Sequence, residues 1–249
     1  MNRAVPFRAL LRSEWTKLRS LRATWWCTAI YLLVVGATGW LAAAGTDRAP
    51  RADVAVGTAL TGFGVGQLVL VVLGVLAVTG EFASGTAMTS LVAVPRRTRL
   101  LLAKTLVVAA YCALLTAVLA PVCALAAAVL TDVPGGIAVL DPGVLRSLGL
   151  QVGAAALTGV LALGLGAVLR STAGAVGAGM ALVFVLPPAL ALAGGTWPSR
   201  LSQALPALRV GEDAFLAVAT AWPVGMAVVG AWAGCVWLLG AVLLERRDV

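Results

Sequence analysis

The sequence predicts an all-α integral membrane protein with about six transmembrane helices, and three observations support this fold class. Of its 249 residues, 61% are hydrophobic and only 11% are charged, whereas soluble domains contain about 45–50% apolar and about 25% charged residues. The apolar residues gather in six long runs that contain no charged side chain near their centres. Alanine, leucine, valine and glycine dominate these runs, which favours helices over barrel strands, in which polar and apolar residues alternate.

Each of the six runs is long enough to cross the hydrocarbon core of a bilayer, which requires about 20 residues of helix. The last run exceeds one crossing, so we expect its span to begin near Trp222. Together the runs predict a single transmembrane domain that occupies residues 1–249. The expected spans are residues 23–44, 54–80, 105–131, 147–169, 171–192 and 214–244.

The basic residues, which give the chain a net charge of +8, are distributed unevenly between the loops. With a cytoplasmic N-terminus, 13 of the 18 basic residues lie on the cytoplasmic side. The other five lie on the outer side and are Arg48, Arg51, Arg146, Arg200 and Arg209. This asymmetry follows the positive-inside rule and predicts that both termini are cytoplasmic. Because membrane orientation accounts for the charge, we expect no nucleic-acid partner.

The residue patterns that carry most membrane chemistry are missing from the sequence. There is no histidine, and the four cysteines lie within expected spans without further ligands nearby, so we expect neither a metal nor a cofactor. The only lysines are Lys17 and Lys104, and neither belongs to a phosphate-binding GxxxxGK[ST] loop. No span has an ionisable residue near its centre, which argues against an ion-coupled pump. We therefore expect no enzymatic activity in this chain and an energy source on another one.

Residues 1–22 precede the first span and have helical periodicity from Pro6 onward. The apolar side chains share one sector of a helical wheel and are Phe7, Leu10, Leu11, Trp15, Leu18 and Leu21. The opposite side carries Arg8, Arg12, Thr16 and Arg19. Such an arginine-rich amphipathic helix is typical of the cytoplasmic headgroup region, which makes membrane lipid an expected partner. The alternative is a solvated basic segment that only orients the first span.

Glu14 interrupts this helix because its carboxylate projects into the middle of the apolar sector. A carboxylate in apolar surroundings is unfavourable unless it is paired. The nearest candidate partner is Lys17, one turn further on, and the more distant candidates are the arginines of the next cytoplasmic loop. The alternative is a glutamate that reaches past the edge of the apolar sector to water.

The largest cytoplasmic loop spans residues 81–99. Met88, Leu91 and Val92 share one face of a short predicted helix, which Pro95 should end because the residue before a proline is driven out of the α region. That apolar face has no partner within so short a loop. Either the loop rests on lipid as an interfacial hairpin, or it docks a cytoplasmic protein, and the pattern supports both equally.

The outer half of the chain is predicted to contain two irregular features. Pro187 and Pro188 should kink or end the fifth span, which follows the fourth after a connection of almost no length at Arg170. Residues 194–221 are expected to form short interfacial or re-entrant helices. Three GxxxG pairs, which begin at Gly62, Gly149 and Gly230, predict close helix packing or a subunit interface.

Several segments resemble a known family. The N-terminal Ser13-Glu14-Trp15-Thr16-Lys17-Leu18-Arg19-Ser20, followed by Thr24-Trp25-Trp26, is similar to the opening of bacterial type-two ATP-binding-cassette (ABC) permeases, especially actinobacterial ones. Glu81-Phe82 with Gly85-Thr86, then Pro95-Arg96-Arg97 and Ala103-Lys104, resemble the loop after the second span of that family. The charged tail Glu245-Arg246-Arg247-Asp248-Val249 is similar as well.

The resemblance implies a six-span permease of the bacterial plasma membrane whose N-terminal helix is an elbow along the membrane. The loop after the second span would dock on a separate ABC ATPase subunit, and two permeases with two ATPases would form an exporter. The implied coupling residues are Glu81, Phe82, Gly85, Thr86, Met88, Leu91, Arg96 and Arg97. The implied elbow residues are Glu14, Trp15, Lys17 and Arg19.

Two other function classes stay open at this point: a non-transporting membrane scaffold or immunity protein, and a channel that works without nucleotide. The cargo is also open. Spans without charge suit an apolar or amphipathic cargo, but they equally suit a polymer that moves through a chamber lined by hydroxyl groups. A homodimer and a heterodimer of permeases are both compatible with the sequence.

Overall fold

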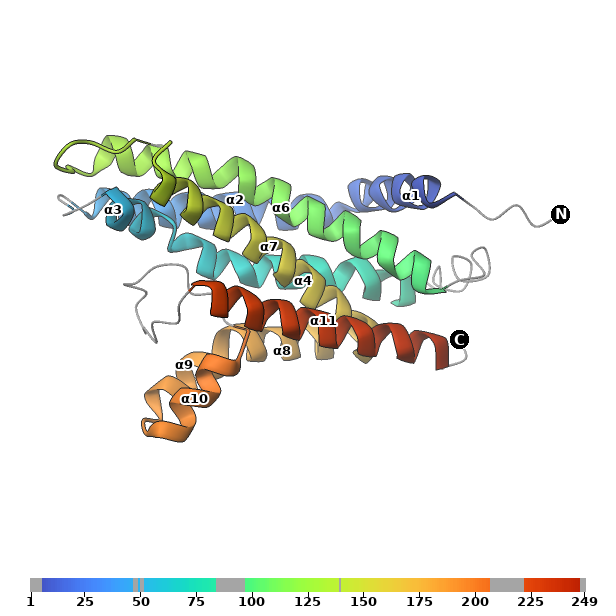
Figure 1. The fold of residues 1–249 in the computed structure, drawn as a ribbon. Coiled ribbons are helices and arrows are strands. Elements are labelled where there is room, and N and C mark those ends of the chain that lie inside the picture. The colour runs from blue at the N-terminus through green and yellow to red at the C-terminus, as the bar shows by residue number, and fades with distance from the viewer. Residues whose placement is uncertain are drawn as a thin grey trace.

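A computed structural model of the chain describes residues 6–46, 49, 52–83, 97–138, 140–206 and 222–246. Every regular element in this part of the chain is helical, and none of these residues forms a strand. Long helices lie side by side in a bundle, and the shorter helices α3, α9 and α10 lie towards one end of it (Figure 1).

Six helical stretches are long and apolar enough to cross a membrane. They are Arg22–Ala44, Val54–Phe82, Thr98–Leu130, Pro142–Leu169, Thr172–Leu190 and Pro223–Arg246. Each corresponds to one predicted run, so the predicted fold class is confirmed and the chain is a multi-pass α-helical membrane protein. The sixth span is formed by α11, which is described from Trp222 to Arg246.

The chain begins with two helices that are separated by a single residue. Helix α1 (Phe7–Ser20) is the predicted N-terminal amphipathic helix, and α2 (Arg22–Ala44) is the first span. Leu21 between them is extended, with φ −75° and ψ 125°, which breaks the helical path. Helix α1 therefore leaves the axis of α2 and lies against other helices.

The second span is made of two helices, α3 (Ala52–Ala59) and α4 (Gly62–Ala83). At the start of α4 the predicted glycine pair packs against α2. A Cβ atom on Gly62 would lie 2.9 Å from the carbonyl oxygen of Val35, and one on Gly66 would lie 2.9 Å from the ring of Tyr31. Both distances are shorter than a real Cβ contact, so these glycines allow α4 to approach α2 closely.

Helix α7 (Pro142–Leu169) is the central helix of the bundle and packs against α4, α6 (Arg97–Leu130) and α11. Small residues bring these helices together. A Cβ on Gly74 of α4 would lie 2.9 Å from the carbonyl oxygen of Gly159, and one on Gly164 would lie 3.0 Å from the backbone nitrogen of Trp237 in α11. The tight helix packing of this bundle thus depends on glycine at specific positions.

The fourth and fifth spans are joined through Arg170, whose left-handed backbone (φ 51°) ends α7. The fifth span consists of α8 (Thr172–Met180), a π-helical turn (Ala181–Val185) and α9 (Leu186–Leu192). The π-helical turn ends one residue before Pro187 and Pro188, which cannot supply backbone N–H groups and clash with the preceding turn. The disturbance predicted at the prolines is therefore a local change from α-helical to π-helical backbone within the fifth span.

The segment of residues 194–221 contains one described helix, α10 (Thr196–Ala204), and its predicted interfacial or re-entrant position stays a prediction. The indole nitrogen of Trp232 in α11 donates a hydrogen bond of 2.7 Å to the carbonyl oxygen of Ala204. Residues 207–221 lie outside the described part of the chain. Helix α1 and the C-terminal end of α11 lie at the same end of the bundle (Figure 1).

Candidate functional site

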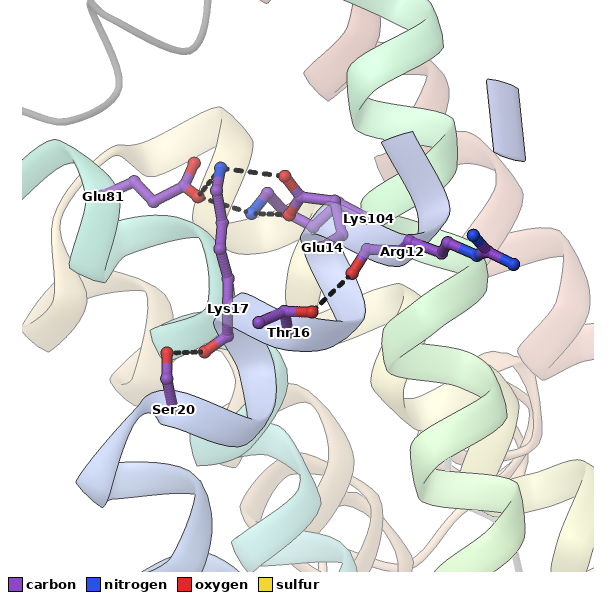
Figure 2. A network of polar contacts seen from close by, with 7 residues as sticks. All are labelled: Arg12, Glu14, Thr16, Lys17, Ser20, Glu81 and Lys104. Carbon is purple, nitrogen blue, oxygen red and sulfur yellow. Dashed lines mark hydrogen bonds and ion pairs between the residues drawn. The ribbon is translucent and has the colours of Figure 1, made fainter. Parts of the chain in front are cut away.

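Four charged side chains from three helices meet at the end of the bundle that carries α1 (Figure 2). Glu14 and Lys17 belong to α1, Glu81 belongs to the last turn of α4, and Lys104 lies two turns into α6. We call these four residues the ion network. Both lysines of the sequence are in it, and its helices α4 and α6 come directly before and after residues 84–96, which lie outside the described part of the chain and belong to the predicted cytoplasmic loop.

Each lysine ammonium of the ion network contacts both carboxylates. The Nζ atom of Lys17 lies 2.9 Å from Oε1 of Glu14 and 3.1 Å from Oε1 of Glu81. The Nζ atom of Lys104 lies 2.5 Å from Oε2 of Glu14 and 2.9 Å from Oε1 of Glu81. Positive and negative groups thus alternate, and the four formal charges sum to zero.

Burial divides the ion network into an inner and an outer part. The side chains of Glu14 and Lys104 are 3% and 9% exposed, whereas those of Lys17 and Glu81 are 39% and 20% exposed. Glu14 is buried because it lies one turn from both Leu10 and Leu18, which are the buried centre of the apolar sector of α1. The buried carboxylate of Glu14 needs ionic partners, and Lys17 and Lys104 supply them.

Lys17 remains charged despite its partial burial. Burial by itself lowers the pKa of Lys17, but the hydrogen bond and the negative charge of Glu14, together with those of Glu81, outweigh burial. The pKa of Lys17 therefore lies above its ordinary value of 10.5. The ammonium group of Lys17 consequently stays positively charged at any physiological pH.

Apolar contacts fix α1 against α6 on both sides of the network. Leu10 packs with Leu100 and Ala103 in a small buried cluster. The rings of Trp15 and Tyr111 meet edge to face, with centroids 6.0 Å apart and planes at 66°. These contacts bury apolar surface between α1 and α6, and the ionic contacts of the network add charge pairing between the same two helices.

The last turn of α4 is also connected to the turn between α7 and α8. The guanidinium carbon of Arg170 lies 5.3 Å from the ring centre of Phe82, in a cation–π contact. Thr172 donates a hydrogen bond of 2.9 Å to the hydroxyl of Thr79, which is buried. The helix that leads into the loop of residues 84–96 thus contacts both α1 and α8.

The structure settles how Glu14 is accommodated. The predicted contact with Lys17 is present, but the expected distant partners, the loop arginines, are wrong, because the second partner is Lys104. The alternative of a glutamate that reaches water is also wrong, since the side chain is buried. Lys104 is not among the predicted site residues. Its signal in the sequence is a lysine that follows four apolar residues, 100–103, near the start of α6.

The other predicted site residues divide into three groups. Glu81 and Trp15 lie in or beside the network, and Phe82 lies next to it. Arg19 is exposed, and its carbonyl oxygen accepts a hydrogen bond from the indole of Trp25. Arg97 is the first residue of α6. The remaining coupling residues lie outside the described part of the chain and are Gly85, Thr86, Met88, Leu91 and Arg96.

The apolar sector of α1 is only partly available to lipid. Leu10 and Leu18 are buried against other helices, whereas Phe7 and Leu21 at the ends of the sector are exposed. The centre of the sector therefore packs within the molecule, although the sequence favours a face that rests on headgroups. The position of α1 relative to a membrane surface stays a prediction.

The cysteines contribute to helix packing. Cys112 and Cys123 are buried, and their sulfur atoms lie 3.0 Å from where a Cβ atom of Gly159 and of Gly39, respectively, would be. Within the described ranges, no three histidine, cysteine, aspartate or glutamate residues are grouped as metal ligands would be. The two carboxylates of the ion network, Glu14 and Glu81, are paired with lysine side chains.

The fold and the ion network define a multi-pass helical membrane protein whose N-terminal helix, α1, is joined by ion pairs to α4 and α6. The profile of a family described as ABC-2 family transporter protein matches residues 10–188, which include all four network residues. The chain therefore belongs to the ABC-2 family and is a membrane permease of an ABC transporter. The predicted resemblance to type-two ABC permeases is confirmed. No curated protein sequence matches the chain.

Proposed function

We propose that this chain is the membrane-spanning subunit of an exporter that is powered by a separate ABC ATPase. The observation that carries this proposal is the family match in a chain without a nucleotide-binding loop. The only lysines that could contact a nucleotide phosphate, Lys17 and Lys104, both contact carboxylates in the ion network. Hydrolysis of ATP is accordingly a task of the partner, and this chain is not an enzyme.

The proposed location is the bacterial plasma membrane, with both termini in the cytoplasm. The excess of basic residues on the side of the N-terminus supports this orientation. So does the position of α1 and the end of α11 at one end of the bundle (Figure 1). The ion network and the loop of residues 84–96 then lie on the cytoplasmic side, where an ATPase can reach them.

In the proposed mechanism the ATPase docks on the loop of residues 84–96. Closure of two ATPase subunits around ATP moves this loop in each of two permease subunits, and helices α4 and α6 move with it. Close glycine contacts such as that of Gly74 with Gly159 pass the movement to α7, because closely packed helices cannot deform locally. The bundle then switches between inward- and outward-facing states.

The cargo class follows from the chemistry of the spans. No ionisable side chain lies near the centre of any expected span, so the protein offers no charged partner to a cargo at that depth. This supports an apolar or amphipathic cargo, such as a drug, a lipid or a hydrophobic peptide, and equally a polymer that moves through a chamber lined by hydroxyl groups.

A pull-down at matched expression tests the docking. Leu91→Asp places a charge on the apolar face that includes Met88, while Ser90→Asp places the same charge on the opposite side of the predicted helix and is the control. We expect Leu91→Asp to insert normally but to lose the co-purifying ATPase, and Ser90→Asp to retain it. Full recovery of the ATPase with Leu91→Asp would remove the loop from this role. Cargo flux in liposomes without nucleotide would contradict the whole proposal.

A further inference from the structure

Three polar side chains are buried between two central helices without a hydrogen-bond partner. Gln67 of α4 is 7% exposed, and Gln151 and Thr158 of α7 are 5% and 2% exposed. Among the residues that the structure describes, none of these three side chains makes a hydrogen bond. Nearly all buried polar groups of folded proteins have a partner, so three unpartnered ones in one bundle require a physical explanation.

The three residues lie on the facing sides of α4 and α7. A Cβ atom on Gly74 of α4 would lie 2.8 Å from the Cβ atom of Ala162 in α7. Gln67 precedes Gly74 by two helical turns and therefore shares its side of α4. Thr158 and Gln151 precede Ala162 by one turn and three turns, which places both on the side of α7 that faces α4.

The three residues also lie at a similar depth in the bundle. As the second and fourth spans of the chain, α4 and α7 run in the same direction. Two turns before the contact of Gly74 with Ala162, Gln67 is therefore level with the turn of α7 between Gln151 and Thr158. Each α7 residue is then within about 6 Å of Gln67 along the bundle axis, because a helix rises about 1.5 Å per residue.

The irregular part of the fifth span lies at the same depth. A Cβ atom on Gly179 of α8 would lie 2.6 Å from Cγ1 of Val71 in α4. The fifth span runs opposite to α4, so one turn before Val71, at Gln67, it has reached its π-helical turn, Ala181–Val185. Single π-helical turns occur often at functional sites. The fifth span is also the least buried of the six described spans, so it can move aside with the smallest loss of contacts.

We propose that Gln67, Gln151 and Thr158 form a binding site for an uncharged polar group of the cargo, such as an amide or a hydroxyl group. The inference rests on the proposed function, because it takes the chain as a permease. Both glutamine amides and the threonine hydroxyl can donate and accept hydrogen bonds, which matches an amide or a hydroxyl group on the cargo. The three side chains offer a charged group no opposite charge. A cargo of this site thus carries at least one neutral hydrogen-bonding group, which excludes a purely apolar molecule.

A ligand site explains why the three polar groups are retained at a cost in stability. A buried amide without a partner destabilises the folded state, and an apolar side chain of the same length avoids this loss. Residues that violate such rules of packing are found at functional sites. Cargo that pairs with the amides compensates for them only while it is bound. Removal of the amides should therefore weaken binding without weakening the fold.

Thermal unfolding of the purified chain in lipid nanodiscs tests this inference. The probe is octanamide, which carries one neutral amide, and its counterpart is nonane, which has a similar length and no polar group. A dye that reacts with the buried thiols of Cys112 and Cys123 reports unfolding. We expect octanamide to raise the unfolding temperature by about 2–4 °C, because a ligand of the folded state stabilises it, and nonane to leave it unchanged.

Two substitutions together remove both amides. Gln67→Met with Gln151→Met keeps the length of the side chains, and without the probe this double variant should unfold at the temperature of the parent or above it. Most of the octanamide shift should be lost. Thr58→Val is the matched control and should keep the shift, because the hydroxyl of Thr58 donates to the carbonyl oxygen of Val54 in its own helix.

The hydroxyl of Thr158 is tested by a second pair of variants. Thr158→Ser keeps the hydroxyl group and should keep the octanamide shift. Thr158→Val keeps the volume of the side chain and removes the hydroxyl, so the shift should fall. A site that depends on shape alone would show the reverse order.

Three results of the unfolding assay would overturn the inference and leave the proposed function intact. The first is a parent that responds no more to octanamide than to nonane, and the second is an equal octanamide shift in the parent and the double methionine variant. The third is a clear loss of stability in the double variant without the probe, because the amides would then already have partners. The proposed function is tested separately, by the ATP turnover of the permease–ATPase complex. A turnover that is the same with and without the permease would overturn the proposed function and the transport role of the site with it.

Discussion

The end of the bundle that carries α1 and the middle of the membrane-spanning region hold their helices together by different chemistry. At the end, Glu14, Lys17, Glu81 and Lys104 make four ionic contacts, of which one lies within α1 and three join different helices. In the middle, the polar contacts are neutral hydroxyl pairs, such as that of Tyr31 with Thr116 at 2.7 Å.

The difference reflects the distance to water. Lys17 and Glu81 remain partly exposed, so water lowers the free energy of the charges at the edge of the ion network. Deep in a span no water is available, and a charge there is far more unfavourable than a hydroxyl group that has one partner. Close contacts at glycine, such as Gly74 with Gly159, replace ionic contacts at that depth. The relative positions of the helices are thus fixed by ionic contacts at the end of the bundle and by close packing at glycines in its middle.

The largest effect is expected from breaking the ion network on one side. Lys104→Met leaves the buried carboxylate of Glu14 with Lys17 as its only partner in the network, and we expect a loss of about 3–5 kcal/mol of stability because a buried charge loses its compensation. Thermal unfolding in detergent measures the loss. Glu245→Gln is the control, because Glu245 is exposed near the end of α11, and it should unfold with the parent. Equal unfolding of Lys104→Met and the parent would show that the network holds nothing in place.

The close packing of α4 against α7 can be disrupted at Gly74. In Gly74→Val the new Cβ would meet the backbone of Gly159 and the side chain of Ala162, and overpacking of this kind lowers stability by about 1–3 kcal/mol. Gly230→Val is the matched control, because no atom lies within 4 Å of its Cβ position. We expect a lower unfolding temperature for the first variant only. The same shift in both would mean that helix propensity, rather than contact, causes it.

A smaller effect is expected from the neutral hydroxyl pair. Tyr31→Phe leaves the buried hydroxyl of Thr116 without its partner from α2, which lowers stability by about 1 kcal/mol in a membrane protein. Adding Thr116→Val removes the remaining hydroxyl and should return most of the loss. A double-mutant cycle of unfolding free energies measures this coupling. Strictly additive losses would contradict the pairing.

The smallest effect is expected at Gln67 in α4. Its side chain is 7% exposed, and within the described part of the chain it makes no hydrogen bond. Gln67→Met keeps the length of the side chain and removes the buried amide, so stability should stay equal or rise by up to about 1 kcal/mol. A clear loss in the unfolding assay would show that the amide has a partner, such as an internal water molecule.

The spans and α1 could be predicted because local sequence decides them. A run of apolar residues partitions into lipid as a helix whatever its neighbours are, and the 3.6-residue period of α1 is visible in the sequence itself. The break at Leu21 and the π-helical turn at Ala181–Val185 were harder to predict. The second of these depends on how the helix accommodates two prolines within a packed bundle.

The candidate site could be predicted only in part. The sequence identifies Glu14 as a carboxylate in need of a partner and Lys17 as the local one, because both lie one turn apart on α1. It points to arginines for the distant partner, since these are the nearest charges in the expected loop. It gives Lys104 no role, because a lysine near the start of a span also suits the headgroup region.

Composition and charge distribution by themselves determine that this chain is a six-span helical membrane protein with an amphipathic N-terminal helix. These properties depend on the transfer of single segments between water and lipid, and each segment carries its own transfer free energy. Only the tertiary structure decides that Glu14 meets Lys104, which is 90 residues away along the chain. That contact requires α1, α4 and α6 to pack in one particular arrangement, and the glycines that permit such packing act between helices and not within any one of them.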